Sequence, residues 1–148
     1  MASYTQITYH IVFSTKNRGP VLVAERRKDL YDYIWGILKN KECFLHRIGG
    51  VADHLHILCG LHPTLALADL IRTIKVSSAG WIRDRRVFPD FTHWQEGYGA
   101  FTCSAAERPR LVKYIRMQEK HHQQVLFRDE LHALLIEHGV KFDERYFR

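Results

Sequence analysis

The sequence predicts an α+β domain with an antiparallel sheet, because segments with two kinds of apolar periodicity follow one another along the chain. Some segments alternate apolar and polar side chains every second residue, as strands do, and others repeat apolar side chains at helical spacing. The length of 148 residues fits one domain with its own core, which we expect to span residues 1–148.

The first half of the chain predicts a strand, a helix and a hairpin. Residues 4–15 alternate with the period of a half-buried strand, and residues 24–40 have an amphipathic helical pattern with charges in the opening turn. Residues 42–50 and 53–61 form two strand-like runs separated by a tight connection after Gly49-Gly50, which predicts a hairpin.

The second half predicts a helix, a strand and two further helices. Thr64 is the expected N-cap of a helix that reaches Asp84, and residues 94–103 return to a strand pattern. We expect helices at 108–124, with Pro109 in its first turn, and at 128–138. The complete order matches the ferredoxin-like split β-α-β plan with an added C-terminal helix.

Composition limits the possible environments and partners. No segment approaches the roughly 18 apolar residues of a membrane helix, and the N-terminal residues lack a signal-peptide pattern, so we expect a cytoplasmic protein. The three cysteines are widely spaced, which predicts reduced core residues rather than a disulfide framework. A net charge of +6 and a pI near 9.4 favour a polyanionic partner.

Two groups of residues could perform chemistry. His54 and His56 stand two apart on a predicted strand, so they share one face and could bind a divalent metal, or could simply lie on a partly exposed sheet surface. Tyr114, Gln118 and His121 are spaced i, i+4 and i+7 and share one helix face. Such a tyrosine is more often a residue at the edge of a core, and the spacing alone does not select it.

Several motifs together resemble the single-tyrosine HUH transposases of the smallest insertion sequences, the IS200-like transposases. The motifs are Tyr9-His10-Ile11-Val12-Phe13-Ser14-Thr15-Lys16, Asp53-His54-Leu55-His56, Trp94-Gln95-Glu96-Gly97-Tyr98-Gly99-Ala100-Phe101, and Tyr114-Ile115 followed by Gln118 and His121-His122. They cover nearly the whole chain in the order of that family.

The resemblance implies an activity and roles for particular residues. It implies that His54, His56 and Gln118 bind Mg²⁺ or Mn²⁺, and that Tyr114 attacks single-stranded DNA to form a 5′-phosphotyrosine. Such an enzyme cleaves and rejoins the ends of an insertion sequence without ATP. Two further residues could assist: His10, on a strand that could neighbour the histidine strand, and Asp53, which could orient a histidine.

The resemblance also implies partners. Single-stranded DNA with hairpins at the element ends is the expected substrate, and the expected assembly is a homodimer in which His54 and His56 of one subunit face Tyr114 of the other. Candidate phosphate contacts are the basic residues Lys16, Arg18, Arg72, Lys75, Arg83, Arg85, Arg86, Lys113 and Arg116.

Other readings of the sequence stay open. A non-catalytic ferredoxin-like nucleic-acid-binding protein would use the same basic charge and sheet aromatics, but it would leave Tyr114 and Gln118 unexplained. A replication initiator or relaxase of the HUH type would usually need a larger chain. A domesticated transposase derivative would retain every motif described above.

Overall fold

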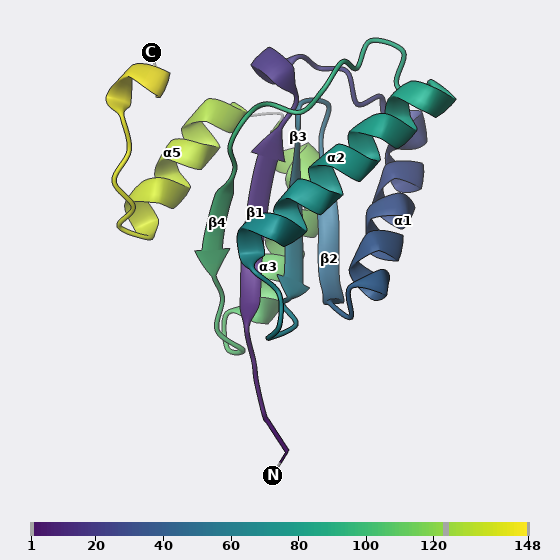
Figure 1. Cartoon of the computed structure of the whole chain (residues 1–148). Coiled ribbons are helices and arrows are strands. Elements are labelled where there is room, and N and C mark those ends of the chain that lie inside the picture. The colour runs from purple at the N-terminus through teal and green to yellow at the C-terminus, as the bar shows by residue number, and fades with distance from the viewer. Residues whose placement is uncertain (1, 123–124, 148) are drawn as a thin grey trace.

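The computed structural model describes residues 2–122 and 125–147 and is built on one four-stranded sheet. Its strands are β1 (Thr8–Ser14), β2 (Phe44–Gly50), β3 (His54–Gly60) and β4 (Gly99–Thr102). They lie in the order β2-β3-β1-β4, and each neighbouring pair is antiparallel (Figure 1).

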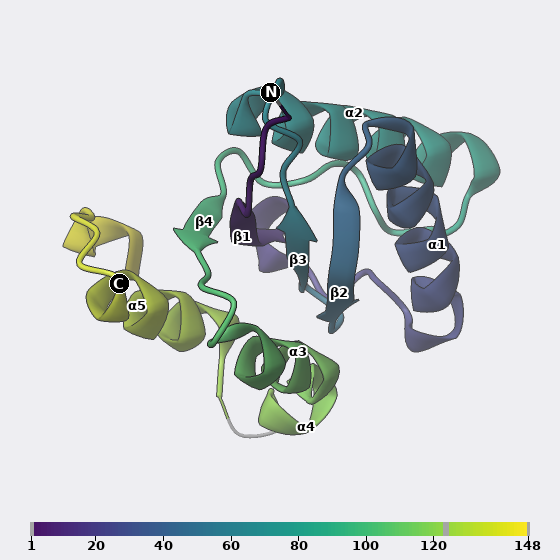
Figure 2. The same ribbon diagram turned by 90° about the horizontal axis from the view of Figure 1, so that it is seen from below.

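Helices cover both faces of this sheet. Helices α1 (Ala24–Asn40) and α2 (Leu67–Arg85) lie on one face, while α3 (Arg108–Arg116) and α4 (Gln118–His121) lie on the other (Figure 2). Helix α5 (Phe127–Glu137) lies near β4, and two short 3-10 helices are η1 (Lys16–Arg18) and η2 (Glu144–Phe147). The strand order and the paired helices α1 and α2 confirm the predicted α+β, ferredoxin-like class.

The main core fills the space between the sheet and helices α1 and α2. It joins alternate residues of β1 and β3 to the apolar stripes of both helices, among them Ile11, Phe13, Leu55, Ile57, Leu30, Ile34, Leu70 and Ile74. Cys43, Cys59 and Cys103 are free and buried, as expected. The opposite face has two smaller apolar clusters, one around Val12 and Phe127 and one around Leu58 and Ile115. The same face also carries the buried polar side chains His10, His54 and His56.

Several predicted boundaries were wrong. Strand β1 begins at Thr8 rather than residue 4, and β4 begins at Gly99, since Trp94 forms only an isolated bridge to Thr15. Thr64 is not an N-cap: its hydroxyl and backbone N–H bond the His62 side chain, and α2 begins two residues after Leu65.

The helix expected at 108–124 is two helices, α3 and α4, separated at Met117. Residues 123–124 of that prediction lie outside the described part of the chain. Pro109 stands in the first turn of α3, as predicted. In the described ranges, no helix combines the length and the apolar character that crossing a membrane requires.

Candidate active site and metal centre

His54 and His56 lie on the sheet face opposite the main core. Strand β3 alternates, so Leu55 and Ile57 enter the main core while both histidines face α3, α4 and α5. Both histidines have 0% exposure, which rules out the reading of a partly exposed sheet surface. Buried polar side chains need partners.

A close contact between α3 and β2 places Tyr114 and Gln118 beside these histidines. The backbone of Gly49 on β2 approaches Ile115 so closely that a Cβ at position 49 would lie 2.8 Å from the Ile115 carbonyl oxygen. Gly49 is also paired with His56 in the sheet. The glycine therefore allows a helix to lie directly over the histidine strand.

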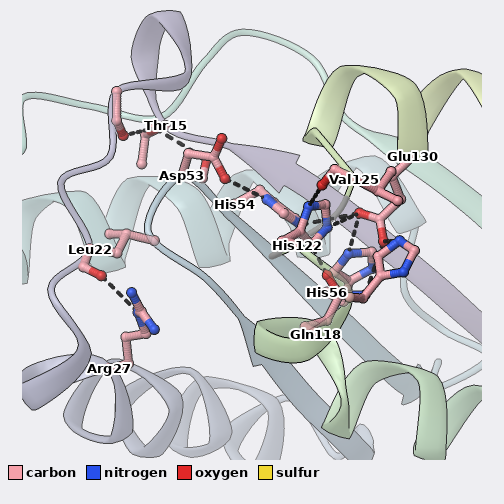
Figure 3. Close-up of polar contacts among 12 residues, drawn as sticks. Thr15, Leu22, Arg27, Asp53, His54, His56, Gln118, His122, Val125 and Glu130 are labelled. Atoms are coloured by element: carbon pink, nitrogen blue, oxygen red, sulfur yellow. Dashed lines mark hydrogen bonds and ion pairs between the residues drawn. The ribbon is translucent and has the colours of Figure 1, made fainter.

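One carboxylate oxygen lies at the centre of the site. Oε1 of Glu130, on α5, is 3.0 Å from Nε2 of His56, 3.2 Å from Nε2 of His54 and 2.9 Å from Nε2 of His122. The Glu130 side chain is 2% exposed. Gln118 Oε1 also lies 3.2 Å from His54 Nε2. Figure 3 shows these side chains converging from β3, α4, the segment after α4 and α5.

The opposite ring nitrogens of two of these histidines also face acceptors. Nδ1 of His54 lies 2.7 Å from Asp53 Oδ1, and Nδ1 of His122 lies within hydrogen-bond distance of the Val125 carbonyl oxygen (Figure 3). Each Nδ1 must therefore hold a hydrogen, which leaves Nε2 of a neutral imidazole as a bare lone pair. That lone pair faces the Glu130 carboxylate, which is also an acceptor. Nδ1 of His56 lies 2.8 Å from His10 Nε2.

A divalent cation fits this arrangement. A metal ion between the Nε2 lone pairs and the carboxylate would satisfy all of them, whereas two or three imidazolium ions would repel one another in the same buried space. The ligand atoms of His54, His56, His122 and Glu130 all lie within 4.8 Å of one another. Imidazole nitrogen, carboxylate oxygen and amide oxygen are common ligands of divalent metals.

The second oxygen of Glu130 contacts the tyrosine. Tyr114 donates its hydroxyl hydrogen to Glu130 Oε2, and Gln118 Nε2 donates to the same oxygen over 3.0 Å. Burial and the negative charge of Glu130 raise the pKa of Tyr114 above its usual 10. The tyrosine is therefore a neutral phenol at pH 7, and its proton has a carboxylate acceptor.

The charges of this buried site are strongly coupled. Burial favours the neutral form of Glu130. When no metal is bound and the Nε2 atoms of His122, His54 and His56 carry protons, hydrogen bonds from these histidines lower the pKa of Glu130 well below its usual 4.5. Burial lowers the pKa of His56, and burial together with the neighbouring His56 lowers that of His10 to about 3. Burial opposes protonation of His54, yet the carboxylates of Asp53 and Glu130 raise its pKa.

The family follows from comparison with known proteins. The model of a family described as "Transposase IS200 like" matches residues 3–118. This chain belongs to the IS200-like transposases. Its function is DNA transposition, and the expectation drawn from its motifs is confirmed.

Relatives of this transposase agree with that placement. It is 28% identical to the ISDra2 transposase TnpA of Deinococcus radiodurans over 123 residues, which cover 76% of this chain and 84% of the relative. The crystal structure of a candidate transposase from D. radiodurans has a TM-score of 0.63 at 25% identity, covering 80% of this chain and 95% of that one.

A further solved structure supports the fold. It is a REP-associated tyrosine transposase bound to a REP hairpin, with a TM-score of 0.64 at 16% identity, and the match covers 84% of this chain and 76% of that one.

The structure brings four predicted residues of the transposase together within one chain: Tyr114, His54, His56 and Gln118. Asp53 contacts His54, and His10 lies on the neighbouring strand β1 with its ring 5.0 Å from that of His56. Sequence reasoning missed Glu130 and gave no role to His122. Glu130 did leave a signal, because it lies at helical spacing between the apolar residues Phe127 and Leu134.

The predicted DNA contacts are spread over the molecule. Lys113 borders a groove of about 390 Å³ beside Tyr114, which Arg110, Met117, Lys120 and His121 also line. Arg116 is exposed on the same helix. Lys113 and Arg116 are therefore predicted DNA contacts on the same helix as Tyr114.

The other predicted contacts lie elsewhere. Lys16 and Arg18 are exposed on η1, and Arg72 is exposed on α2, on the opposite side of the sheet. Lys75 is half-buried and donates to the carbonyl oxygens of Gln95 and Gly97, each over 2.7 Å. Arg83 donates to the carbonyl of Thr92, while Arg85 and Arg86 are exposed at the end of α2.

Proposed function

We propose that this transposase cleaves and rejoins single-stranded DNA at the ends of an insertion sequence, with Tyr114 as the nucleophile. The observation that supports this most strongly is the Glu130 carboxylate, which accepts the Tyr114 hydroxyl hydrogen on one oxygen and faces three imidazoles with the other. The proposed nucleophile, a carboxylate that can accept its proton and the proposed metal ligands therefore lie in one place, which supports the proposal.

The proposed reaction exchanges one phosphodiester for another. The Tyr114 oxygen attacks phosphorus, a bond from this oxygen to phosphorus forms, and the bond from phosphorus to the 3′ oxygen breaks. The phenol proton passes to Glu130 Oε2, which releases it to solvent water, and the departing 3′ oxygen takes a proton from solvent water to become a hydroxyl. The products are a 5′-phosphotyrosine and a free 3′-hydroxyl. Attack by another 3′-hydroxyl reverses these steps, so rejoining needs no ATP.

Proton removal is a large part of the barrier. A phenol of pKa about 10 costs roughly 4 kcal/mol to ionise at pH 7, and the pKa of Tyr114 is raised further. Direct ionisation before attack is therefore unfavourable, and a proton acceptor in contact with the hydroxyl supports loss of the proton during attack.

We propose His54, His56 and Gln118 as ligands of Mg²⁺ or Mn²⁺. When bound, the cation would make the scissile phosphorus more electrophilic and stabilise the departing oxygen. Asp53 fixes the ring of His54, and His10 contacts the ring of His56, so both side chains hold the ligand histidines in orientation.

The basic groove beside Tyr114 supports a DNA path to the nucleophile. Lys113, Arg110 and Lys120 line it and could neutralise phosphates on either side of the cleaved bond. The similar fold of a transposase bound to a REP hairpin supports hairpin DNA as the substrate class. We propose that Lys16, Arg18, Arg72 and Arg116 contact more distant phosphates, while Lys75 orders the 95–97 loop.

The homodimer with shared sites stays a prediction. In the structure of one chain, Tyr114 meets the histidines of its own chain through Glu130. A shared site would require the segment from α3 to α5 to exchange between two subunits while keeping the same contacts. A cytoplasmic location, where chromosomal DNA is accessible, belongs to the same proposal.

The test uses labelled oligonucleotides that tile the DNA flanking the gene. Incubated with Mg²⁺ or Mn²⁺, single-stranded oligonucleotides from the element ends should give a protein–DNA adduct on a denaturing gel, and fully paired duplexes should not. EDTA should abolish the adduct. Equal cleavage of duplexes would contradict the preference for single strands, and cleavage in EDTA would contradict the metal. DNA binding without an adduct at any tile would favour a non-catalytic or domesticated derivative.

A further inference from the structure

We propose that Glu130 and His122 are ligands of the metal, so that the C-terminal helix α5 forms part of the catalytic metal centre. This inference rests on the proposed function, which uses a metal held by His54, His56 and Gln118. It adds two ligands from the chain segment that follows α4, and it gives each oxygen of Glu130 a separate role.

The positions of the two Glu130 oxygens support the assignment. Oε1 faces the Nε2 atoms of the histidines at 2.9 to 3.2 Å, while Oε2 accepts hydrogen bonds from Tyr114 and Gln118. Such a carboxylate can bind a cation with one oxygen and position the nucleophile with the other. A fully buried carboxylate without a cation partner would be costly.

His122 is oriented as a metal ligand. Its Nδ1 donates to the Val125 carbonyl, which directs the Nε2 lone pair toward the position between the three imidazoles. Its ring packs edge-on against that of His54, with 4.4 Å between centroids. The backbone bond from His122 N–H to the Gln118 carbonyl, at 2.9 Å, connects its position to that of another proposed ligand.

This ligand set has a chemical consequence. Three imidazole nitrogens with one carboxylate and one amide oxygen favour Mn²⁺ over Mg²⁺, because Mg²⁺ prefers an all-oxygen environment. Five protein ligands would also leave a six-coordinate ion one position for a phosphate oxygen. The transposase should therefore bind Mn²⁺ tightly without DNA.

A competing reading makes the opposite prediction. In it, Glu130 occupies the metal position as a hydrogen-bonded plug, and the carboxylate would have to leave before a cation enters. Removing a ligand weakens metal binding, whereas removing a plug strengthens it. The sign of the change therefore separates the two readings.

The experiment titrates the full-length protein with Mn²⁺ alone and follows free Mn²⁺ by electron paramagnetic resonance. Glu130→Gln, Glu130→Ala and His122→Ala should each weaken Mn²⁺ binding at least about tenfold, since even residues that only support metal ligands cost about 10- to 100-fold. Asp129→Asn and His132→Ala are matched controls on the same helix. Asp129 is 59% exposed beside Arg128, and His132 contacts Phe142 and Glu144, so both controls should bind Mn²⁺ like the wild type.

His56→Ala tests the metal site of the proposed function separately from Glu130, and this variant should abolish Mn²⁺ binding. If it does while the Glu130 variants bind Mn²⁺ as tightly as the wild type or more tightly, the role of Glu130 is wrong and the metal site of the proposed function stands. If His56→Ala also binds normally, the metal site itself is wrong.

Amide hydrogen exchange provides a second readout that does not depend on catalysis. Mn²⁺ should slow exchange across Phe127–Glu137 in the wild type and not in Glu130→Gln, because the metal would hold α5 on the sheet. Equal protection of α5 in both proteins would overturn the proposal.

Discussion

Substituting Gly49 by alanine tests whether the close approach of α3 to β2 sets the geometry of the active site. The new Cβ would lie 2.8 Å from the Ile115 carbonyl oxygen and 3.0 Å from Ile115 Cγ2, whereas ordinary contacts begin near 3.4 Å. Either α3 retreats by about 0.6 Å, which displaces Tyr114, or β2 moves, which disturbs its pairing with His56.

The expected loss follows from this overlap. Overpacking of this kind costs roughly 1–3 kcal/mol. A chain of this size loses about 2–4 °C of melting temperature for each kcal/mol, so a decrease of roughly 2–12 °C is expected. Because a misplacement of about 1 Å can cost about 100-fold in rate, the smaller shift here should slow adduct formation about tenfold.

Gly36→Ala is the matched control, since a Cβ at that position on α1 would meet no atom within 4 Å among the described residues, apart from its chain neighbours and the backbone of its own helix. The same chemical change should there raise stability by about 0.5–1 kcal/mol, because alanine is the better helix former. Circular dichroism melts in EDTA and the initial rate of adduct formation measure both variants. A Gly49→Ala protein with wild-type melting temperature and wild-type rate would refute the packing argument.

Three further predictions concern the site itself. Tyr114→Phe should keep the fold within about 1 kcal/mol and keep DNA binding, yet give no covalent adduct; an undiminished adduct would assign the nucleophile to another tyrosine. The pKa of Glu130 is lowered on folding, so ionised Glu130 stabilises the metal-free protein above pH 4.5, and this stabilisation is lost as the pH falls below 4.5. The free energy of unfolding of Glu130→Gln, measured in urea, should therefore fall less between neutral and acidic pH than that of the wild type. If active sites are shared, heterodimers of Tyr114→Phe and His56→Ala subunits should recover about half of the wild-type cleavage. Verified heterodimers that stay inactive would mean that each site works within one chain, as the structure arranges it.

The sequence was sufficient for the elements with a clear period. The α1 prediction of residues 24–40 matches the structure at both ends, because its apolar stripe at Leu30, Ile34 and Leu38 packs fully against the sheet. The strand pattern also predicted the shared face of His54 and His56. The N-cap prediction at Thr64 was wrong, because the Thr64 hydroxyl bonds the His62 side chain instead of a backbone N–H at a helix N-terminus.

The complete site could not be predicted from periodicity. Glu130 has the spacing of a core residue on α5, but whether a carboxylate on an apolar stripe is a buried ligand depends on what α5 packs against. Helix α5 packs against the strand that carries the histidines, and Glu130 follows His56 by 74 residues in the chain. The resemblance supplied Tyr114 and Gln118 as a functional pair, and the structure adds the contacts that join them through Glu130.

Identification of the residue that becomes attached to DNA tests the central claim most directly. The transposase would be incubated with Mn²⁺ and a single-stranded oligonucleotide from the element end, digested with nuclease and trypsin, and examined by mass spectrometry. The proposed chemistry predicts a nucleotide joined through its 5′ phosphate to the peptide that contains Tyr114, and a free 3′-hydroxyl on the released strand. A nucleotide attached to any other residue, or a released strand that ends in a 3′ phosphate, would contradict it.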